Sequence, residues 1–342
     1  MSVAAPVANA ADIVNSSPMP RAIRIHETGG PEVLRVETVE SERLGARQVR
    51  IRQTAVGVNF IDTYDRSGLY PVSLPSGLGR EAAGTVIEVG KGVKTLREGD
   101  RVAYAGTVPG AYCEERVMDA ARVVKLPEAI SDREAAALLL KGLTAWFLLR
   151  RLHRVRRNER VLLHGAAGGV GLIALQWAAA LGARVIAVVG SDQKRALVAA
   201  HGAAEVIVRS REDVVERVRA VTKKRGVTVV YDGVGKDTFF ASLDCLAPRG
   251  LMVSFGNASG AVPPFSPLEL TKRGSLFLTR PTLFHYTAKP SELARGAREL
   301  FDAVASGKVK LRIGQTWPLV EAADAHRALE ARRTTGSSLL IP

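Results

Sequence analysis

The stretch RVLLHGAAGGVG, residues 160–171, constrains the fold more than any other part of the chain. An apolar run at 161–163 ends in a loop of small residues, and a helical apolar pattern begins at Val170. A second apolar run follows at 184–189, the spacing of a βαβ unit. Small residues let a pyrophosphate approach the backbone. The positive dipole end and the free N–H groups of the next helix then stabilise the bound anion. The stretch predicts a nicotinamide dinucleotide site; the alternative is a turn that serves packing alone.

The pattern around this stretch predicts two kinds of structure. From 160 to about 280, apolar runs alternate with helical patterns, which is typical of a doubly wound parallel sheet. From Arg21, short alternating runs with Gly and Pro punctuation predict an antiparallel β module, into which we expect the tail after 283 to return. Ser131 and Glu134 predict a capping box for a helix that reaches 152. The predicted strands of the sheet are 160–164, 184–189, 205–208, 227–232, 250–255 and 275–279.

Composition limits the class of protein. The chain has 342 residues, 46% hydrophobic and 24% charged, as in a soluble protein of two domains, and no apolar run approaches the ~18 residues of a membrane span. Its two cysteines, Cys113 and Cys245, cannot form a disulfide framework, which favours a reducing, cytoplasmic location. The net charge of +14 is scattered without interleaved aromatic residues, so a solvated basic surface is favoured over a nucleic-acid site. Residues 1–18 contain no Lys or Arg and are expected to form a flexible extension rather than a targeting signal.

The end of the second predicted strand indicates which cofactor is preferred. An NAD site places a carboxylate there, about 20 residues past the glycine loop. This chain has Gly190 and Ser191 instead, followed by Lys194, and Arg209 follows the next strand. A small residue beside cations suits a 2′-phosphate, so NADPH is predicted. Asp192 is expected to be the N-cap of the next helix.

Motifs spread over the chain resemble the zeta-crystallin-like quinone oxidoreductases, the zinc-free branch of the medium-chain dehydrogenases/reductases. The resemblance implies an α/β protein with a discontinuous GroES-like β-rich catalytic domain, 19–142 and 283–342, and a Rossmann domain, 143–282. It also implies a homodimer, formed through the strand at 275–279. The motifs that carry it are GGPEVL (29–34), VNFIDTYDRSGLYP (58–71), GREAAGTV (79–86), GDRVAY (99–104), KGLTAW (141–146), HGAAGGVGLIALQWA (164–178), SFGNASGAV (254–262) and GSSLLIP (336–342).

No metal is predicted. Zinc-dependent relatives carry Gly-His-Glu and a four-cysteine lobe, whereas this chain reads Gly79-Arg80-Glu81 and has two cysteines. Zinc needs four such ligands, or three with an open position. The six histidines show no ligand spacing and are expected to be structural or exposed.

Hydride transfer without a metal requires hydrogen-bond donors beside the acceptor oxygen. Candidates are Asn59, Asp62, Tyr64 and Tyr70; a structural role for the tyrosines at a half-buried strand end is the alternative. The resemblance places Asn59 and Tyr64 at the nicotinamide end. The further cofactor contacts that it implies are Lys141, Thr144, Gly168, Gly169, Val170, Gly190, Ser191, Lys194, Arg209, Phe255, Gly256, Asn257 and Arg280.

The resemblance implies an NADPH-dependent quinone oxidoreductase. Reduction of an enone or alkenal double bond is the alternative within enzymes, and RNA binding or a structural role is the alternative of another class. Two departures from relatives concern the cofactor. Trp146-Phe147 stands where relatives often have a tyrosine, and Arg209 replaces a tyrosine near the 2′-phosphate.

Overall fold

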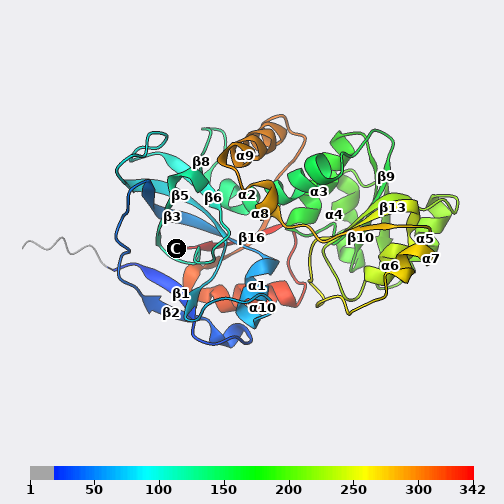
Figure 1. Ribbon diagram of the computed structural model, residues 1–342, viewed down its shortest axis with the longest axis horizontal. Helices are drawn as coiled ribbons and strands as arrows, with labels where there is room; N and C mark the ends of the chain where they lie inside the picture. Colours follow the sequence, from blue (N-terminus) through cyan, green and yellow to red (C-terminus); the bar gives the residue numbers. More distant parts are fainter. Residues whose placement is uncertain (1–18) are drawn as a thin grey trace, which may run out of the picture.

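The computed structural model describes residues 19–342, so the extension expected over 1–18 lies outside the described residues. The molecule is elongated, with a β-rich part at one end and an α/β part at the other (Figure 1). Within residues 19–342, the strands form a six-stranded, a seven-stranded and a three-stranded sheet. Over the same residues, no helix is both long enough and apolar enough to cross a bilayer.

The six-stranded sheet is parallel throughout and has the order β11-β10-β9-β12-β13-β14. The chain starts this sheet in its middle, at β9, and extends it to one side through β10 and then to the other through β12. Ligands of such sheets bind beyond the carboxyl ends of the strands where the order reverses. The strands are β9 (Arg160–His164), β10 (Arg184–Val189), β11 (Glu205–Val208), β12 (Val227–Asp232), β13 (Leu246–Ser254) and β14 (Phe277–Thr279).

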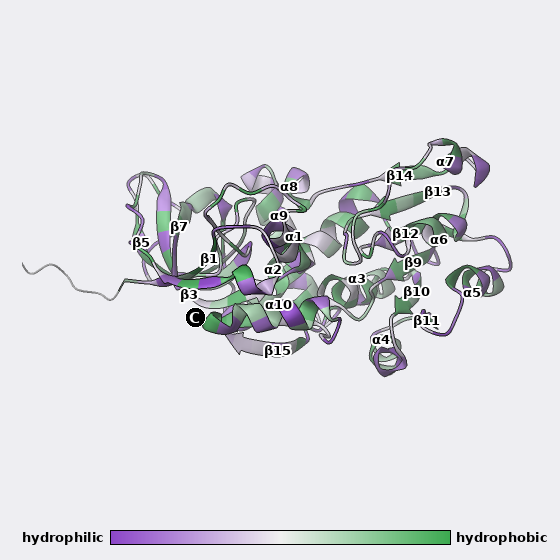
Figure 2. Ribbon diagram, turned by 90° about the horizontal axis from the view of Figure 1, so that it is seen from below, coloured by the Kyte–Doolittle hydropathy of each residue, from purple (hydrophilic) through white to green (hydrophobic). Residues whose placement is uncertain are grey.

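Both faces of this sheet are buried, because alternate side chains of β9 enter different cores. Val161 and Leu163 pack with α2 and α3, whereas Leu162 packs with α5 and α6. The central strands β9, β10 and β12 are accordingly mostly hydrophobic (Figure 2). The helices of this part are α3 (Gly169–Ala180), α4 (Arg195–Ala200), α5 (Val214–Val221), α6 (Phe239–Asp244) and α7 (Leu268–Lys272).

The β-rich part contains the seven-stranded sheet, β15-β16-β3-β5-β6-β8 with β7 on β3, and the sheet β2-β1-β4. The tail returns here as predicted, since Ser338 of β16 pairs with Val58 of β3. The strands are β1 (Arg21–Ile25), β2 (Arg35–Thr38), β3 (Gln48–Val58), β4 (Ser76–Gly77), β5 (Glu81–Val89), β6 (Arg101–Ala105), β7 (Glu115–Asp119), β8 (Val123–Lys125), β15 (Ile313–Pro318) and β16 (Ser337–Ile341).

Helix α2 (Asp132–Phe147) connects the two parts. The predicted capping box of Ser131 and Glu134 is confirmed at its start, and a short π-helix over Leu148–Leu152 continues it. It contacts β3, β5 and β6 as well as α3, so it runs through the predicted domain boundary at 142. The predicted boundaries themselves stay predictions. The other helices of this region are α8 (Leu283–Tyr286), α9 (Pro290–Ala305) and α10 (Ala322–Glu330).

Helix α1 (Phe60–Ser67) corrects the sequence analysis, which placed Tyr64 at the end of a strand. The side chain of Asp62 accepts a hydrogen bond from the backbone N–H of Asn59, as part of a capping box. The start signal was therefore present in the sequence as Asn-x-x-Asp. Helix α1 lies at the inner end of the β-rich part (Figure 1), and its Tyr64 hydroxyl accepts a hydrogen bond from Asn257, which follows β13 of the parallel sheet.

Candidate active site

A cavity of about 450 Å³ lies between the β-rich part and the carboxyl edge of the parallel sheet. We call it the cleft cavity. It brings together ten of the predicted site residues, from segments that are far apart in the sequence. These are Asn59, Tyr64, Tyr70, Thr144, Gly168, Gly169, Val170, Phe255, Gly256 and Arg280.

The turn between β9 and α3 has the geometry of a phosphate-binding loop. Gly165 has φ +64°, a left-handed conformation that side chains disfavour, and an added Cβ at Gly171 would clash with the Gly165 carbonyl. No side chain caps α3 at Gly168, so its first N–H groups are available to an anion. The N–H groups at the start of a helix and its positive dipole end fit the pyrophosphate of a dinucleotide.

Beside this turn, the end of β10 leaves room for a ribose. A Cβ built on Gly190 would meet no heavy atom within 4 Å. Ser191 is the N-cap of a short 3-10 helix over Asp192–Lys194. The expectation that Asp192 caps this helix was therefore wrong; its carboxylate instead pairs with Arg211 at 2.7 Å.

Three cations converge near the ends of β10 and β11, and we call Lys194, Arg209 and Arg332 the basic cluster. The Lys194 ammonium donates to the backbone carbonyls of Arg332, at 2.9 Å, and Thr334, at 3.2 Å. Arg209 and Arg332 both lie near the carboxylate of Asp237, at 3.7 and 3.4 Å. Burial lowers the pKa of Lys194, and the charge of Arg332 adds to that effect. The Asp237 carboxylate and the two backbone carbonyls hold three cations close together, and such a group of cations is suited to binding a phosphate dianion.

Sequence reasoning missed Arg332 as a site residue, because it is 138 residues from Lys194 in the sequence. Its only signal was the adjacent pair Arg332-Arg333 just before GSSLLIP. The fold joins that pair to the site, because Thr334 and Gly336 of the same segment line the cleft cavity.

Lys141 does not line the cavity. Its ammonium pairs with the buried carboxylate of Glu81, which also accepts from the backbone N–H of Leu140, at 2.7 Å, and from the amide of Asn59, at 2.9 Å. The Lys141 stem lies against Gly169, where an added Cβ would approach its Cδ to 2.6 Å. Lys141 thus braces the phosphate loop from behind and fixes the Asn59 amide at the cavity wall.

Two hydrogen bonds cross the cleft at the end away from the basic cluster. The backbone N–H of Asn257 donates to the Tyr64 hydroxyl, and the Arg280 guanidinium donates to the Tyr70 hydroxyl, each at 2.9 Å. The two tyrosine rings meet edge to face, with centroids 5.3 Å apart. Burial raises the pKa of Tyr64 to about 12, so its hydroxyl keeps its proton at neutral pH.

A buried network anchors α1 to α10. The Tyr112 hydroxyl donates to Asp62 at 2.9 Å and lies 3.0 Å from His326 Nε2. The guanidinium of Arg66 lies 3.1 Å from His326 Nδ1 and pairs with Glu330 at 2.6 Å. Burial raises the pKa of Asp62 to about 7 and lowers that of His326 to about 3. The network makes α1, and with it Tyr64, a rigid wall of the cavity.

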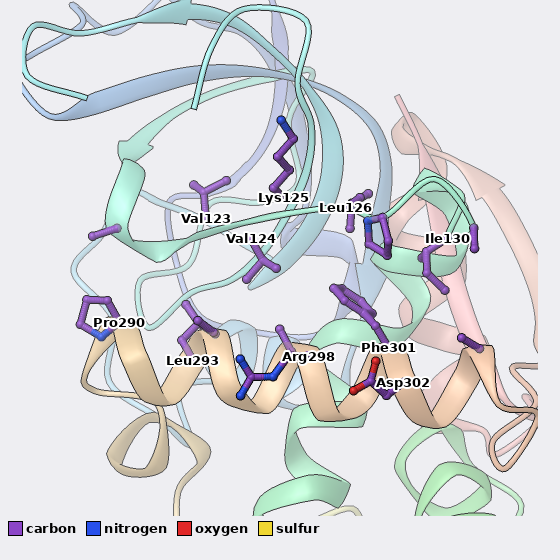
Figure 3. Close-up of a pocket in the computed structure, with 16 residues that line it drawn as sticks. Val123, Val124, Lys125, Leu126, Ile130, Pro290, Leu293, Arg298, Phe301 and Asp302 are labelled. Carbon is purple, nitrogen blue, oxygen red and sulfur yellow. The ribbon is translucent and has the colours of Figure 1, made fainter. Parts of the chain in front are cut away.

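A second cavity, of about 560 Å³, lies on the outer surface between β8 and α9 (Figure 3). Val124, Leu293 and Phe301 give it an apolar floor, and Arg298 lies at its edge. It contains none of the predicted site residues, so the cleft cavity is the candidate active site.

The fold and the cleft cavity together define a two-part dehydrogenase of the medium-chain dehydrogenase/reductase class. Residues 45–128 match the alcohol dehydrogenase GroES-like domain, and residues 169–292 match the zinc-binding dehydrogenase family. The chain belongs to the zinc-free quinone oxidoreductase family within this class.

Three relatives illustrate the similarity. A quinone oxidoreductase of Pseudomonas aeruginosa is 50% identical over 325 residues, which cover 95% of this chain and 100% of the relative. The structure of Escherichia coli quinone oxidoreductase complexed with NADPH superimposes with a TM-score of 0.93 at 50% identity, covering 94% of this chain and 100% of that chain. A 2-haloacrylate reductase of Burkholderia sp. is 44% identical over 331 residues, covering 95% of this chain and 99% of the relative.

The residues present do not fit the zinc site that the second family description implies. Arg80, in the position of the histidine ligand, pairs with Asp65 at 2.8 Å and lies over the ring of Phe284, 5.7 Å from its centroid. Cys113 is buried and lies 3.3 Å from the Gln53 amide, and burial raises the pKa of its thiol to about 12. Across residues 19–342, no three His, Cys, Asp or Glu side chains are grouped closely enough to hold a metal ion. The absence of a metal stays a prediction.

Proposed function

We propose that this protein is an NADPH-dependent quinone oxidoreductase that works without a metal. The observation that carries the proposal is that one cavity joins the phosphate loop at Gly168 to the hydroxyls of Tyr64 and Tyr70. The quinone oxidoreductases at 50% identity, one of them complexed with NADPH, support it.

NADPH fits the site along the carboxyl edge of the parallel sheet. The N–H groups of Gly169 and Val170 would face its pyrophosphate, and the basic cluster its 2′-phosphate. Thr144, Gly256 and Asn257 would then lie at the nicotinamide end, with Phe255 beside them. Lys141 would act from behind the phosphate loop and not touch the cofactor. Gly190 supports this placement, because it leaves open space at the end of β10. The carboxylate that an NAD site has at this position would repel a 2′-phosphate.

Bound NADPH supplies a hydride, which carries two electrons and one hydrogen. The quinone gains this hydride and one proton from water, so hydroquinone and NADP⁺ are the products. Tyr64 keeps its proton at neutral pH and can donate a hydrogen bond to the oxygen on which negative charge develops. Asn59, held by Glu81 at 2.9 Å, positions a second polar group at the wall. The apolar side chains of Phe147, Leu283 and Phe284 exclude water from the acceptor.

Reduction of an activated carbon–carbon double bond is a second candidate, favoured by the 44% identical 2-haloacrylate reductase. Steady-state rates with 1,4-naphthoquinone and with an α,β-unsaturated ketone separate the two. Our proposal predicts a higher kcat/KM for the quinone; negligible quinone turnover beside rapid ketone reduction would contradict it.

The protein would act as a cytoplasmic homodimer, joined through β14. This strand is the last in the order of the six-stranded sheet, and Phe277 on it is 61% exposed. An edge strand with an exposed aromatic side chain is suited to pairing with a second copy. Light scattering tests this: the wild type should have twice the mass of the Phe277→Asp variant, whereas a wild-type monomer would contradict it. Cell fractionation tests the location.

A further inference from the structure

We propose that Arg280 makes the acceptor end of the cleft cavity selective for acceptors that carry an anionic group, such as a sulfonate or a carboxylate, beside the carbon that accepts hydride. This inference rests on the proposed function and adds a substrate class to it. The sequence analysis assigned Arg280 to the cofactor; its place in the sheet favours the acceptor instead.

Arg280 is the one permanently charged side chain among the described residues that line the cleft cavity. His164 is the other ionisable nitrogen base there, and burial lowers its pKa, which keeps it neutral. No ion pair found among residues 19–342 includes Arg280. Its guanidinium donates instead to neutral oxygens: the carbonyl of Ser254, at 2.9 Å, and the hydroxyl of Tyr70, at 2.9 Å. With the Asn257 amide in its favoured orientation, that amide oxygen also accepts from Arg280, at 3.2 Å.

A cation that faces only neutral oxygens keeps its attraction for an anion. Arg280 is exposed, so water screens part of that attraction. The described residues that line the cleft cavity include no carboxylate to compete for the guanidinium, so a charge-assisted hydrogen bond to a substrate anion is open to it. The guanidinium presents a planar pair of donors that matches the oxygens of a carboxylate or a sulfonate.

The phosphates of NADPH would lie elsewhere along the sheet. The phosphate loop follows β9 and the basic cluster follows β10 and β11, whereas Arg280 follows β14. Three strand steps separate β9 from β14 in the order of the sheet, which is about 14 Å at ~4.8 Å a step. Arg280 instead lies beside the edge-to-face pair of Tyr64 and Tyr70. It therefore faces the acceptor and not the pyrophosphate or the 2′-phosphate.

An acceptor with an anionic group is reduced by the same two-electron step as a neutral quinone. The acceptor gains the hydride and one proton from water, NADP⁺ forms, and the sulfonate or carboxylate is unchanged. Arg280 contributes to binding and orientation, since an anion on the guanidinium fixes which ring carbon faces the nicotinamide.

The test compares two acceptors, 1,4-naphthoquinone and 1,4-naphthoquinone-2-sulfonate, in the wild type, Arg280→Gln and Arg280→Lys. Arg298→Gln, at the edge of the outer cavity, is the matched control, because it removes the same charge from a side chain that is exposed. We expect Arg280→Gln to lower the ratio of kcat/KM for the sulfonate to that for the neutral quinone about 10- to 100-fold. Arg280→Lys should recover most of the ratio, and Arg298→Gln should leave it unchanged. An equal loss with both acceptors, or a raised KM for NADPH at an unchanged ratio, would overturn the inference.

A binding measurement separates this inference from the proposed function. With NADP⁺ present no turnover occurs, and calorimetry then gives the affinity for 1,4-naphthoquinone-2-sulfonate directly. If the wild type reduces neither quinone yet binds the sulfonate more tightly than Arg280→Gln does, the anion site stands and the quinone oxidoreductase proposal fails. If both quinones are reduced and sulfonate affinity is the same in the two proteins, the quinone oxidoreductase proposal stands and the anion site fails.

Discussion

The backbone N–H of Asn257 donates a hydrogen bond to the hydroxyl of Tyr64 across the cleft, at 2.9 Å. Asn257 follows β13 of the parallel sheet, and Tyr64 is on α1 of the β-rich part. The bond uses an acceptor lone pair of the hydroxyl and leaves its proton free for another oxygen. A tyrosine held in this way can stabilise charge on the acceptor while it helps to keep the cleft closed.

The first prediction follows from this bond. Tyr64→Phe should lower kcat with 1,4-naphthoquinone about 10- to 100-fold, because a donor to the developing oxyanion is lost. The affinity for NADPH should change less than about threefold, since the ring remains.

Because burial raises the pKa of Tyr64 to about 12, wild-type kcat should show no loss from tyrosine ionisation up to pH 10. Tyr231→Phe, whose hydroxyl bonds the Leu148 carbonyl at 3.2 Å, is the control and should keep its activity. An unchanged kcat with weakened NADPH binding would give Tyr64 a purely structural role.

The second prediction concerns the basic cluster. Lys194→Ala should weaken NADPH binding about 10- to 100-fold, because one charged partner of the 2′-phosphate is lost. NADH, which lacks that phosphate, should bind about as before. Arg195→Ala is the matched control, because Arg195 is the next residue, at the start of α4, and its guanidinium pairs with Glu212, at 3.4 Å. Titration by fluorescence measures both affinities; equal losses for NADPH and NADH would mean that Lys194 does not meet the phosphate.

The third prediction reverses the cofactor preference. Gly190→Asp places a carboxylate at the end of β10, where the backbone leaves open space. The new charge should repel the 2′-phosphate of NADPH and accept a hydrogen bond from the ribose of NADH. We expect the ratio of kcat/KM for NADPH to that for NADH to fall at least about 100-fold, with Gly190→Ala close to wild type. A ratio that stays the same in Gly190→Asp would place the adenosine ribose elsewhere.

The fourth prediction tests the buried pair behind the phosphate loop. Lys141→Met leaves the Glu81 carboxylate, which is fully buried, without its counter-charge. Removing one partner of such a pair costs about 3–5 kcal/mol in the free energy of unfolding. The double variant with Glu81→Gln should recover much of that loss, which urea denaturation measures. The single variant Glu81→Gln is measured as well. If the loss of unfolding free energy in the double variant equals the sum of the losses in the two single variants, the two side chains are not coupled.

The fifth prediction comes from two buried groups with opposite proton linkage, both bonded to Tyr112. Asp62 has its pKa raised by burial to about 7, so the folded state binds a proton before the unfolded state does, and stability rises as the pH falls from 7 to 4. His326 has its pKa lowered by burial to about 3, so the unfolded state binds a proton first, and stability falls as the pH falls from 6.5 to 3. Each slope is at most about 1.4 kcal/mol per pH unit, and between pH 4.5 and 6.5 they oppose each other.

Each single variant should therefore expose the slope of the other group. Asp62→Asn should lose stability as the pH falls from 6.5 to 4.5, and His326→Gln should gain it, while the wild type changes little between these limits. Calorimetric unfolding at several pH values gives the slope of the free energy of unfolding against pH for each protein. The comparison uses these slopes and not the absolute stabilities. Three parallel slopes would contradict the linkage.

Much of the α/β part could be predicted from the sequence because its strands are buried on both faces. Such strands are uninterrupted apolar runs, so β9 to β12 have the predicted limits. Helix α1 was missed because FIDTYD is short and polar after a long strand, although Asn59 and Asp62 form its capping box. The pairs Glu81–Lys141 and Lys194–Arg332 were missed for a different reason. They join residues 60 and 138 apart, and only the finished fold determines such contacts.

The central claim is that the cleft cavity transfers a hydride from NADPH to a quinone without a metal. Its most direct measurement is anaerobic stoichiometry: NADPH oxidation is followed at 340 nm while hydroquinone is quantified, with and without a metal chelator. We predict one hydroquinone per NADPH, at a rate that the chelator does not change and that exceeds the rate with NADH. A chelator that abolishes the reaction, or NADPH that is not consumed when quinone is added, would contradict the claim.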